Sequence, residues 1–127
     1  MRPIRQFAPA LMAAVVASAC ATTSRMPVTD VPAGTYVLVE PESEEYHAVA
    51  VNESAFAVRE GNMTMTGQHW LDSDGQLHMT VDSGPCAGQE SIWTYTFANN
   101  RVTLNLVEDM CTARDPAFPQ RMVYERQ

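Results

Sequence analysis

Residues 91–107, SIWTYTFANNRVTLNLV, decide the fold of this chain because they have the pattern of a β-hairpin. Successive side chains of a strand point to opposite faces, so Trp93, Tyr95 and Phe97 share one face, while Ile92 and the threonines share the other. The second run alternates valine or leucine with polar residues in the same way. Between the runs, residues 98–100 include two asparagines, which tolerate the positive φ of a tight hairpin. The segment therefore predicts two antiparallel strands with one buried face and one solvent-exposed face.

The rest of the chain after residue 33 repeats this pattern of short β runs separated by turn residues. With the hairpin strands at 91–97 and 101–107, the expected strands are 36–40, 46–51, 55–59, 63–70, 76–82 and 121–126. No window shows a long helical period, and one helical turn at 108–114 is the most that the pattern allows. We expect an all-β fold, a small antiparallel up-and-down barrel of eight strands that has no open edges, with a two-layer β-sandwich as the alternative.

The N-terminus has the three parts of a secretory signal: Arg2 and Arg5, an apolar stretch at 7–16, and the small residues 17–19. Cys20 follows directly, and this order resembles a bacterial lipoprotein signal, in which the cysteine is lipidated and becomes the new N-terminus. Ala21 stands where an aspartate would indicate retention at the inner membrane. We therefore expect a lipid anchor on the periplasmic side of the outer membrane. The alternative is an ordinary signal peptide, cleaved near Ala19 without lipidation.

These features divide the chain into a signal peptide at 1–19, a lipidated cysteine and flexible tether at 20–33, and one barrel domain at 34–127. The tether is small, polar and proline-punctuated. The formal charge is −7, and it becomes −9 once Arg2 and Arg5 leave with the signal peptide. Such a surface repels nucleic acid, which excludes a nucleic-acid partner, and would favour a basic partner protein.

Once Cys20 carries lipid, Cys86 and Cys111 are the two cysteines left to pair with each other. An exported protein folds in an oxidising compartment, so we expect these two cysteines to form one disulfide. Near Cys111, Asp109 is expected to cap a turn and Arg114 to pair with a carboxylate, and the alternative is that these two residues contact a ligand.

The strand pattern and the segment Gly34-Thr35-Tyr36 resemble the lipocalin or calycin group, whose first strand carries a Gly-x-Trp signature. Trp93-Thr94-Tyr95 after Cys86, and then Asp109-x-Cys111-x-x-Arg114, are similar to small bacterial lipocalin-like lipoproteins of uncharacterised role. The resemblance covers most of the chain after the leader, with Tyr36 at the place of the tryptophan. It implies that an arginine of the last strand, Arg126 or Arg121, packs across Tyr36 and closes one end of the barrel.

The expected inward-facing side chains have two interpretations. They can line an apolar pocket for a hydrophobic ligand, or they can fill the core, because an eight-stranded barrel is just wide enough for its own side chains. The candidates for pocket or core are Trp93, Tyr95, Phe97, Met63, Met65 and Leu104.

No pattern of catalytic residues appears, so we expect a protein that is not an enzyme and that has no cofactor. Met63, Met65, His69, His78 and Met79 have the soft donors that suit copper, but methionine is also a common gap-filler, and we expect no metal site. The leading functional hypothesis is binding of a small hydrophobic molecule or lipid in the barrel. The alternative is a protein-binding module, such as an inhibitor of a periplasmic protease or of lysozyme, that captures a basic enzyme through its acidic surface.

Overall fold

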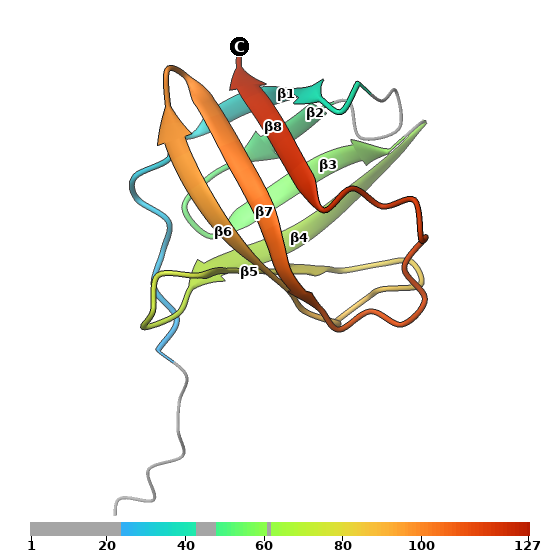
Figure 1. The fold of residues 1–127 in the computed structure, drawn as a ribbon. Coiled ribbons are helices and arrows are strands. Elements are labelled where there is room, and N and C mark those ends of the chain that lie inside the picture. Colours follow the sequence, from blue (N-terminus) through green and yellow to red (C-terminus); the bar gives the residue numbers. More distant parts are fainter. Residues whose placement is uncertain (1–23, 43–47, 61) are drawn as a thin grey trace, which may run out of the picture.

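Eight antiparallel strands form a closed barrel in the computed structural model, which describes residues 24–42, 48–60 and 62–127 (Figure 1). The strands are β1 (Gly34–Glu40), β2 (Ala48–Val51), β3 (Ala55–Glu60), β4 (Met63–Leu71), β5 (Leu77–Val81), β6 (Ser91–Ala98), β7 (Arg101–Asp109) and β8 (Arg121–Arg126). Each strand pairs with the next, and β8 pairs with β1. The predicted eight-stranded up-and-down barrel is confirmed, and the sandwich alternative is excluded.

Helix is absent from the described residues. The helical turn considered for 108–114 is wrong, because β7 continues to Asp109 by pairing with Ser91 of β6. No helix in the described ranges reaches the length and hydrophobicity needed to cross a membrane.

Turn residues close the hairpins as their chemistry predicts. Between β6 and β7, Asn99 and Asn100 adopt φ values of 54° and 64°, so that Ala98 pairs with Arg101. Between β4 and β5, the Asp72 carboxylate accepts the N–H groups of Asp74 at 2.8 Å and Gln76 at 3.0 Å. The same turn contains Gly75 at φ 78°. Positive φ at two asparagines in one turn, and the Asp72 hydrogen bonds in the other, therefore set the register of the two hairpins.

The barrel interior contains the buried core. Tyr36 of β1 and Trp93 of β6 are only 1% exposed and are its largest fully buried side chains. On β4, Gly67 faces inward, and a Cβ there would lie 2.4 Å from the ring of Phe56 and 2.1 Å from the carbonyl oxygen of Thr80. The missing side chain lets Phe56 lie across β4, which no larger residue would allow.

Residues 24–33 pack against the barrel, so the expected tether boundary at residue 33 is wrong. Val28 is 5% exposed and belongs to the core. Met26 exchanges two backbone hydrogen bonds with Leu71, at 2.9 and 2.8 Å, and the Val28 N–H donates to Glu53. Burial of an apolar side chain and pairing with β4 outweigh the proline-rich, polar composition that suggested a tether. The expected signal peptide at 1–19 and Cys20 lie outside the described residues.

The two ends of the barrel are therefore built differently. Residues 24–33 lie at one end, together with the turns that join β2 to β3, β4 to β5 and β6 to β7. At the opposite end lie the longer connections 82–90 and 110–120, as Figure 1 shows by the blue segment on one side and the long loops on the other. We call these two connections the mouth loops.

Replacing Val28 tests whether residues 24–33 belong to the folded domain. Val28→Ala removes buried apolar surface and is expected to lower the free energy of unfolding by about 1–2.5 kcal/mol. The neighbouring Thr29→Ala, at an exposed position, should change it by less than about 0.5 kcal/mol. Chemical denaturation of both variants makes the comparison. Equal, negligible effects would mean that the segment is the tether that its composition suggests.

Candidate functional site

The barrel interior contains a cavity of about 310 Å³. This volume is at the lower end of the range of about 300–1,000 Å³ found for small-molecule pockets. Its wall is mainly apolar and comes from all eight strands; among its side chains are Val49, Val51, Val58, Met65, Leu77, Met79, Val81, Trp93, Val102, Leu104 and Met122. The structure therefore shows that the core does not fill the barrel.

Small residues on one wall explain the empty space. On β2 and β3 the cavity is lined by Val49, Val51 and Val58, and the inward position at the middle of β4 is Gly67. The aromatic side chains of β6 face this wall from the other side of the barrel. An eight-stranded barrel is just wide enough for its own side chains, so the valines at these positions leave room in the interior, whereas the space at Gly67 is taken by the ring of Phe56.

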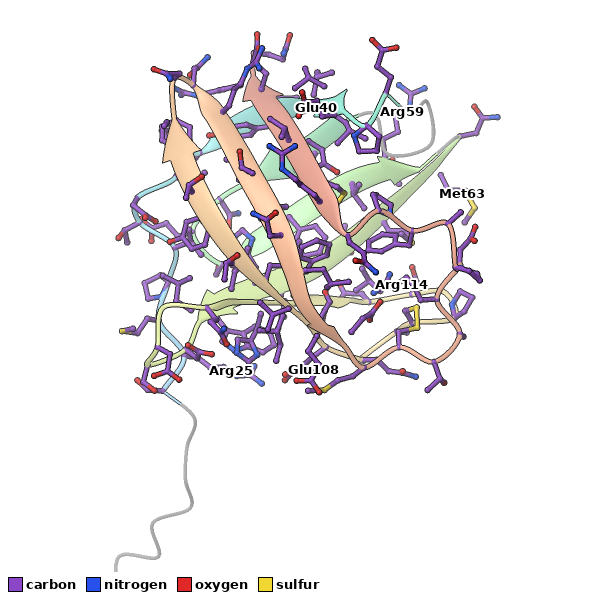
Figure 2. All side chains as sticks on the ribbon, viewed as in Figure 1. Arg25, Glu40, Arg59, Met63, Glu108 and Arg114 are labelled. Atoms are coloured by element: carbon purple, nitrogen blue, oxygen red, sulfur yellow. A yellow bond between two sulfur atoms is a disulfide. The ribbon has the colours of Figure 1, made fainter. Side chains whose placement is uncertain are left out.

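Most predicted interior residues lie where the strand pattern places them. Trp93, Tyr95, Leu104 and Met65 line the cavity, and Phe97 packs against the core cluster. Met63 is the exception: its side chain is 70% exposed, so its prediction as a pocket or core residue is wrong. Met63 pairs with Glu60 at the tip of the β3–β4 hairpin, where the strands extend past the barrel wall, and Figure 2 shows it pointing away from the barrel.

Arg126 lies at the end of the barrel that residues 24–33 cover. It is the register partner of Tyr36, and its guanidinium donates to the carbonyl oxygen of Ala33 at 3.2 Å. Burial raises the pKa of Tyr36, and the nearby positive charge of Arg126 partly opposes this effect. Arg121, the other candidate for barrel closure, is exposed and forms an ion pair with Glu40 at 2.8 Å. Of the two arginines, Arg126 is therefore the neighbour of Tyr36, and packing of its guanidinium across the ring to close the barrel stays a prediction.

His69 is a buried polar residue of the cavity wall, 7% exposed. Its Nε2 lies 2.6 Å from the carbonyl oxygen of Asn52, so Nε2 bears the hydrogen and donates it. Burial lowers the pKa of His69 and outweighs the hydrogen bonds to the backbone, which raise it. The ring also stacks on Phe56, with 5.9 Å between centroids. His69 is thus a neutral imidazole at neutral pH.

A disulfide joins the two mouth loops. Cys86 of 82–90 and Cys111 of 110–120 are bonded, as predicted from the cysteine count. The Asp109 carboxylate accepts a hydrogen bond from the N–H of Cys111 at 3.1 Å. It also accepts hydrogen bonds from Nε and Nη2 of Arg114 at 2.8 and 3.3 Å. The predicted roles of Asp109 and Arg114 are therefore confirmed. The Arg114 guanidinium also lies over the ring of Phe118, 4.4 Å from its centroid, on the same side of the barrel as the disulfide (Figure 2).

An ionisable cluster that the sequence did not reveal lies on the outer wall. His78 contacts the carboxylates of Asp72 at 2.7 Å and Glu90 at 3.1 Å, and its ring stacks on Trp70. Arg25 lies over the same Trp70 ring, 3.9 Å from its centroid. Asp72 and Glu90 are 18 positions apart and meet only because β4, β5 and β6 are neighbours. The spacing along the chain therefore carries no signal for this cluster.

The copper hypothesis has no geometric support. His69 pairs with Met79 on the inner face of the barrel, whereas His78 pairs with Trp70 and contacts its partners on the outer face. The sheet separates the two imidazoles. Among the described residues, no three histidine, cysteine, aspartate or glutamate side chains are grouped in a way that suits a metal ion.

Comparison of the chain with models of protein families, with curated proteins and with solved structures finds no match.

The outer cluster predicts how stability depends on pH. Burial alone would lower the pKa of His78, but hydrogen bonds to Asp72 and Glu90 and their negative charges raise it above its usual value of about 6.5. The protonated form is therefore favoured in the folded state. Its contribution to stability is full below pH ~6.5 and is lost as pH rises through the folded-state pKa.

Wild type is therefore expected to lose unfolding free energy between pH ~6 and ~8, and His78→Gln should reduce this loss, measured by denaturation at several pH values. His69→Gln is the matched control. Burial lowers the pKa of His69, so His69 contributes stability above pH ~6.5 that is lost as pH falls through its folded-state pKa, and its variant should change the slope below pH ~6.5, with the opposite sign. An unchanged slope in His78→Gln would contradict the assignment of the ion pairs.

Proposed function

We propose that this protein binds a small hydrophobic molecule inside the barrel. The observation that carries the proposal is the cavity of about 310 Å³ with its mainly apolar wall. Burying apolar surface contributes roughly 25 cal/mol per Å², so a ligand that fills such a space gains affinity without specific polar contacts. The volume suits a medium-chain acyl group or a molecule of one or two rings, and is too small for a bulky lipid.

The ends of the barrel support this role. Residues 24–33 and Arg126 cover one end, where Val28 and Val31 contribute to the cavity wall. At the other end, exposed residues of the mouth loops also line the cavity, among them Ser83, Pro85 and Asp115. A ligand would enter between the mouth loops, and the disulfide keeps these loops at a set distance from each other. The cavity thus reaches the exposed residues of the mouth loops, while residues 24–33 cover the other end.

Binding accounts for the site better than catalysis does. The buried polar groups on the cavity wall are committed to hydrogen bonds within the protein, as His69 is to Asn52. A catalytic side chain must have a proton or a lone pair free to reach a substrate atom. General acid–base catalysis also needs two groups of different pKa that face the same reacting centre. We therefore propose a binding protein without enzymatic activity. The alternative function, in which the acidic surface captures a basic enzyme, stays a prediction. The geometry of the described loops does not favour it.

We also propose that lipid on Cys20 anchors the protein to the outer membrane on the periplasmic side. Cys20 is five positions before Arg25, which packs on Trp70. Five residues of extended chain span at most about 18 Å. A lipid on Cys20 would therefore hold the covered end of the barrel near the membrane, and the mouth loops, at the opposite end, would face away from it.

Filling the cavity tests the binding role. Val58 of β3 lines the cavity, whereas its neighbour Ala57 alternates to the outer face. Val58→Trp should weaken binding of an uncharged fluorescent probe, N-phenylnaphthylamine, at least tenfold in titration, because the indole occupies the probe's space. Ala57→Trp introduces the same side chain outside the barrel and should bind like wild type.

Thermal unfolding of both tryptophan variants checks that each is folded. Equal probe affinity in wild type, Val58→Trp and Ala57→Trp would place the probe on the surface and would contradict binding in the barrel.

The anchor is tested by expressing the full chain in a Gram-negative bacterium supplied with labelled palmitate. Wild type should incorporate the label and sediment with the outer membrane, whereas Cys20→Ser should remain unlabelled and soluble in the periplasm. Ser24→Ala, which leaves Cys20 in place, should behave like wild type. Wild-type protein that is exported but unlabelled would show that the leader is an ordinary signal peptide.

A further inference from the structure

The charges on the cavity wall restrict the kind of ligand that the proposed site can take. Among the residues that the structure describes, six ionisable side chains line the cavity: Tyr36, His69, Tyr95, Arg114, Asp115 and Tyr124. What each of them can offer to a ligand follows from its contacts within the protein.

The interior offers no positive charge to a ligand through His69. Its imidazole is neutral, because burial lowers its pKa, and its Nε2 hydrogen is already donated to Asn52. Tyr36 donates its hydroxyl to the carbonyl oxygen of Pro32, and Tyr95 donates to the carboxylate of Asp30 at 2.7 Å. Burial, with the hydrogen bond to Asp30 and its charge, raises the pKa of Tyr95, so this phenol stays neutral. These groups present uncharged surface to the cavity.

In the described part of the chain, Arg114 is the cation of the cavity wall, and its charge is already compensated. Two of its nitrogens contact the carboxylate of Asp109, which is itself only 15% exposed. Burial would raise the pKa of Asp109, but the hydrogen bonds from Arg114 and from the Cys111 N–H, with the positive charge of Arg114, together outweigh it and keep the pKa below its usual value. Asp115, exposed and also on the cavity wall, adds a second carboxylate close to the mouth. Asp109, Arg114 and Asp115 together carry a net negative charge.

We propose that the cavity selects uncharged hydrophobic ligands and discriminates against carboxylates. This inference rests on the proposed binding function. A fatty-acid anion that entered the barrel would lose its hydration and would meet an arginine already neutralised by Asp109, beside another carboxylate. An alcohol or ester with the same chain loses far less hydration on entry. The preferred ligand class is therefore a neutral amphiphile or aromatic molecule, such as a fatty alcohol, an acyl ester or an uncharged ring compound.

The inference is tested by competition against N-phenylnaphthylamine, with decanol and decanoate as competitors of equal chain length below their aggregation limits. On wild type at pH 7.5, decanol should displace the probe at concentrations at least tenfold lower than decanoate. Lowering the pH toward the carboxyl pKa of decanoate should reduce the difference, because the protonated acid is neutral.

Asp109→Asn tests the stated cause. The asparagine retains an oxygen to accept the N–H of Cys111, but it no longer neutralises Arg114. The variant should bind decanoate at least fivefold more tightly than wild type and decanol with unchanged affinity. Glu108→Gln, at an exposed position on the same strand, removes a carboxylate without freeing Arg114 and should leave both affinities unchanged.

The outcomes separate this inference from the function on which it rests. Decanoate that competes on wild type as well as decanol, with Val58→Trp blocking both, would overturn the selectivity and leave the binding role in place. Failure of both competitors, with the probe insensitive to Val58→Trp, would overturn the binding role and the selectivity together. The wild-type pH series decides the selectivity even if Asp109→Asn does not fold.

Discussion

The pairing of β1 with β8 is the constraint on which the rest of this structure depends. Tyr36 opposite Arg126, and Leu38 opposite Tyr124, join the first strand to the last and convert a meander into a barrel. Without this pairing, both strands would be open edges, which are prone to aggregation. Closure also turns the inner face of every strand toward one interior, so that Tyr36 and Trp93, far apart in sequence, are both fully buried.

The two ends of the closed barrel differ in structure, so they are not equivalent for a ligand or a membrane. Residues 24–33 cover one end, where Val28 belongs to the core. The Arg126 guanidinium donates a hydrogen bond to the carbonyl oxygen of Ala33, just before β1. At the other end, the Cys86–Cys111 disulfide ties together two loops that surround the cavity. In the chain-entropy model, a disulfide that closes a loop of 25 residues stabilises the fold by about 3–4 kcal/mol, which offsets part of the packing energy lost at an interior that the core does not fill.

Much of this architecture could be predicted because it depends on local patterns. Alternation over 91–107 predicts the hairpin of β6 and β7, asparagine predicts its turn, and the cysteine count predicts the disulfide. The failures have a common origin in contacts between distant segments. Burial of Val28 depends on a gap at the barrel end, and exposure of Met63 depends on how far the β3–β4 hairpin extends. Whether the interior is filled depends on which side chains face each other across the barrel, and a strand pattern does not contain that information.

The central claim is that the interior is an accessible apolar cavity, and xenon tests it most directly. Xenon enters apolar cavities without polar contacts, so crystals of the protein exposed to xenon under pressure report whether the space exists. We expect xenon inside the barrel, in contact with Val58, Met65 and Met79. It should lie between the aromatic side chains of β6 and the valines of β2 and β3. A crystal structure in which these side chains meet one another and the interior contains no xenon would contradict it.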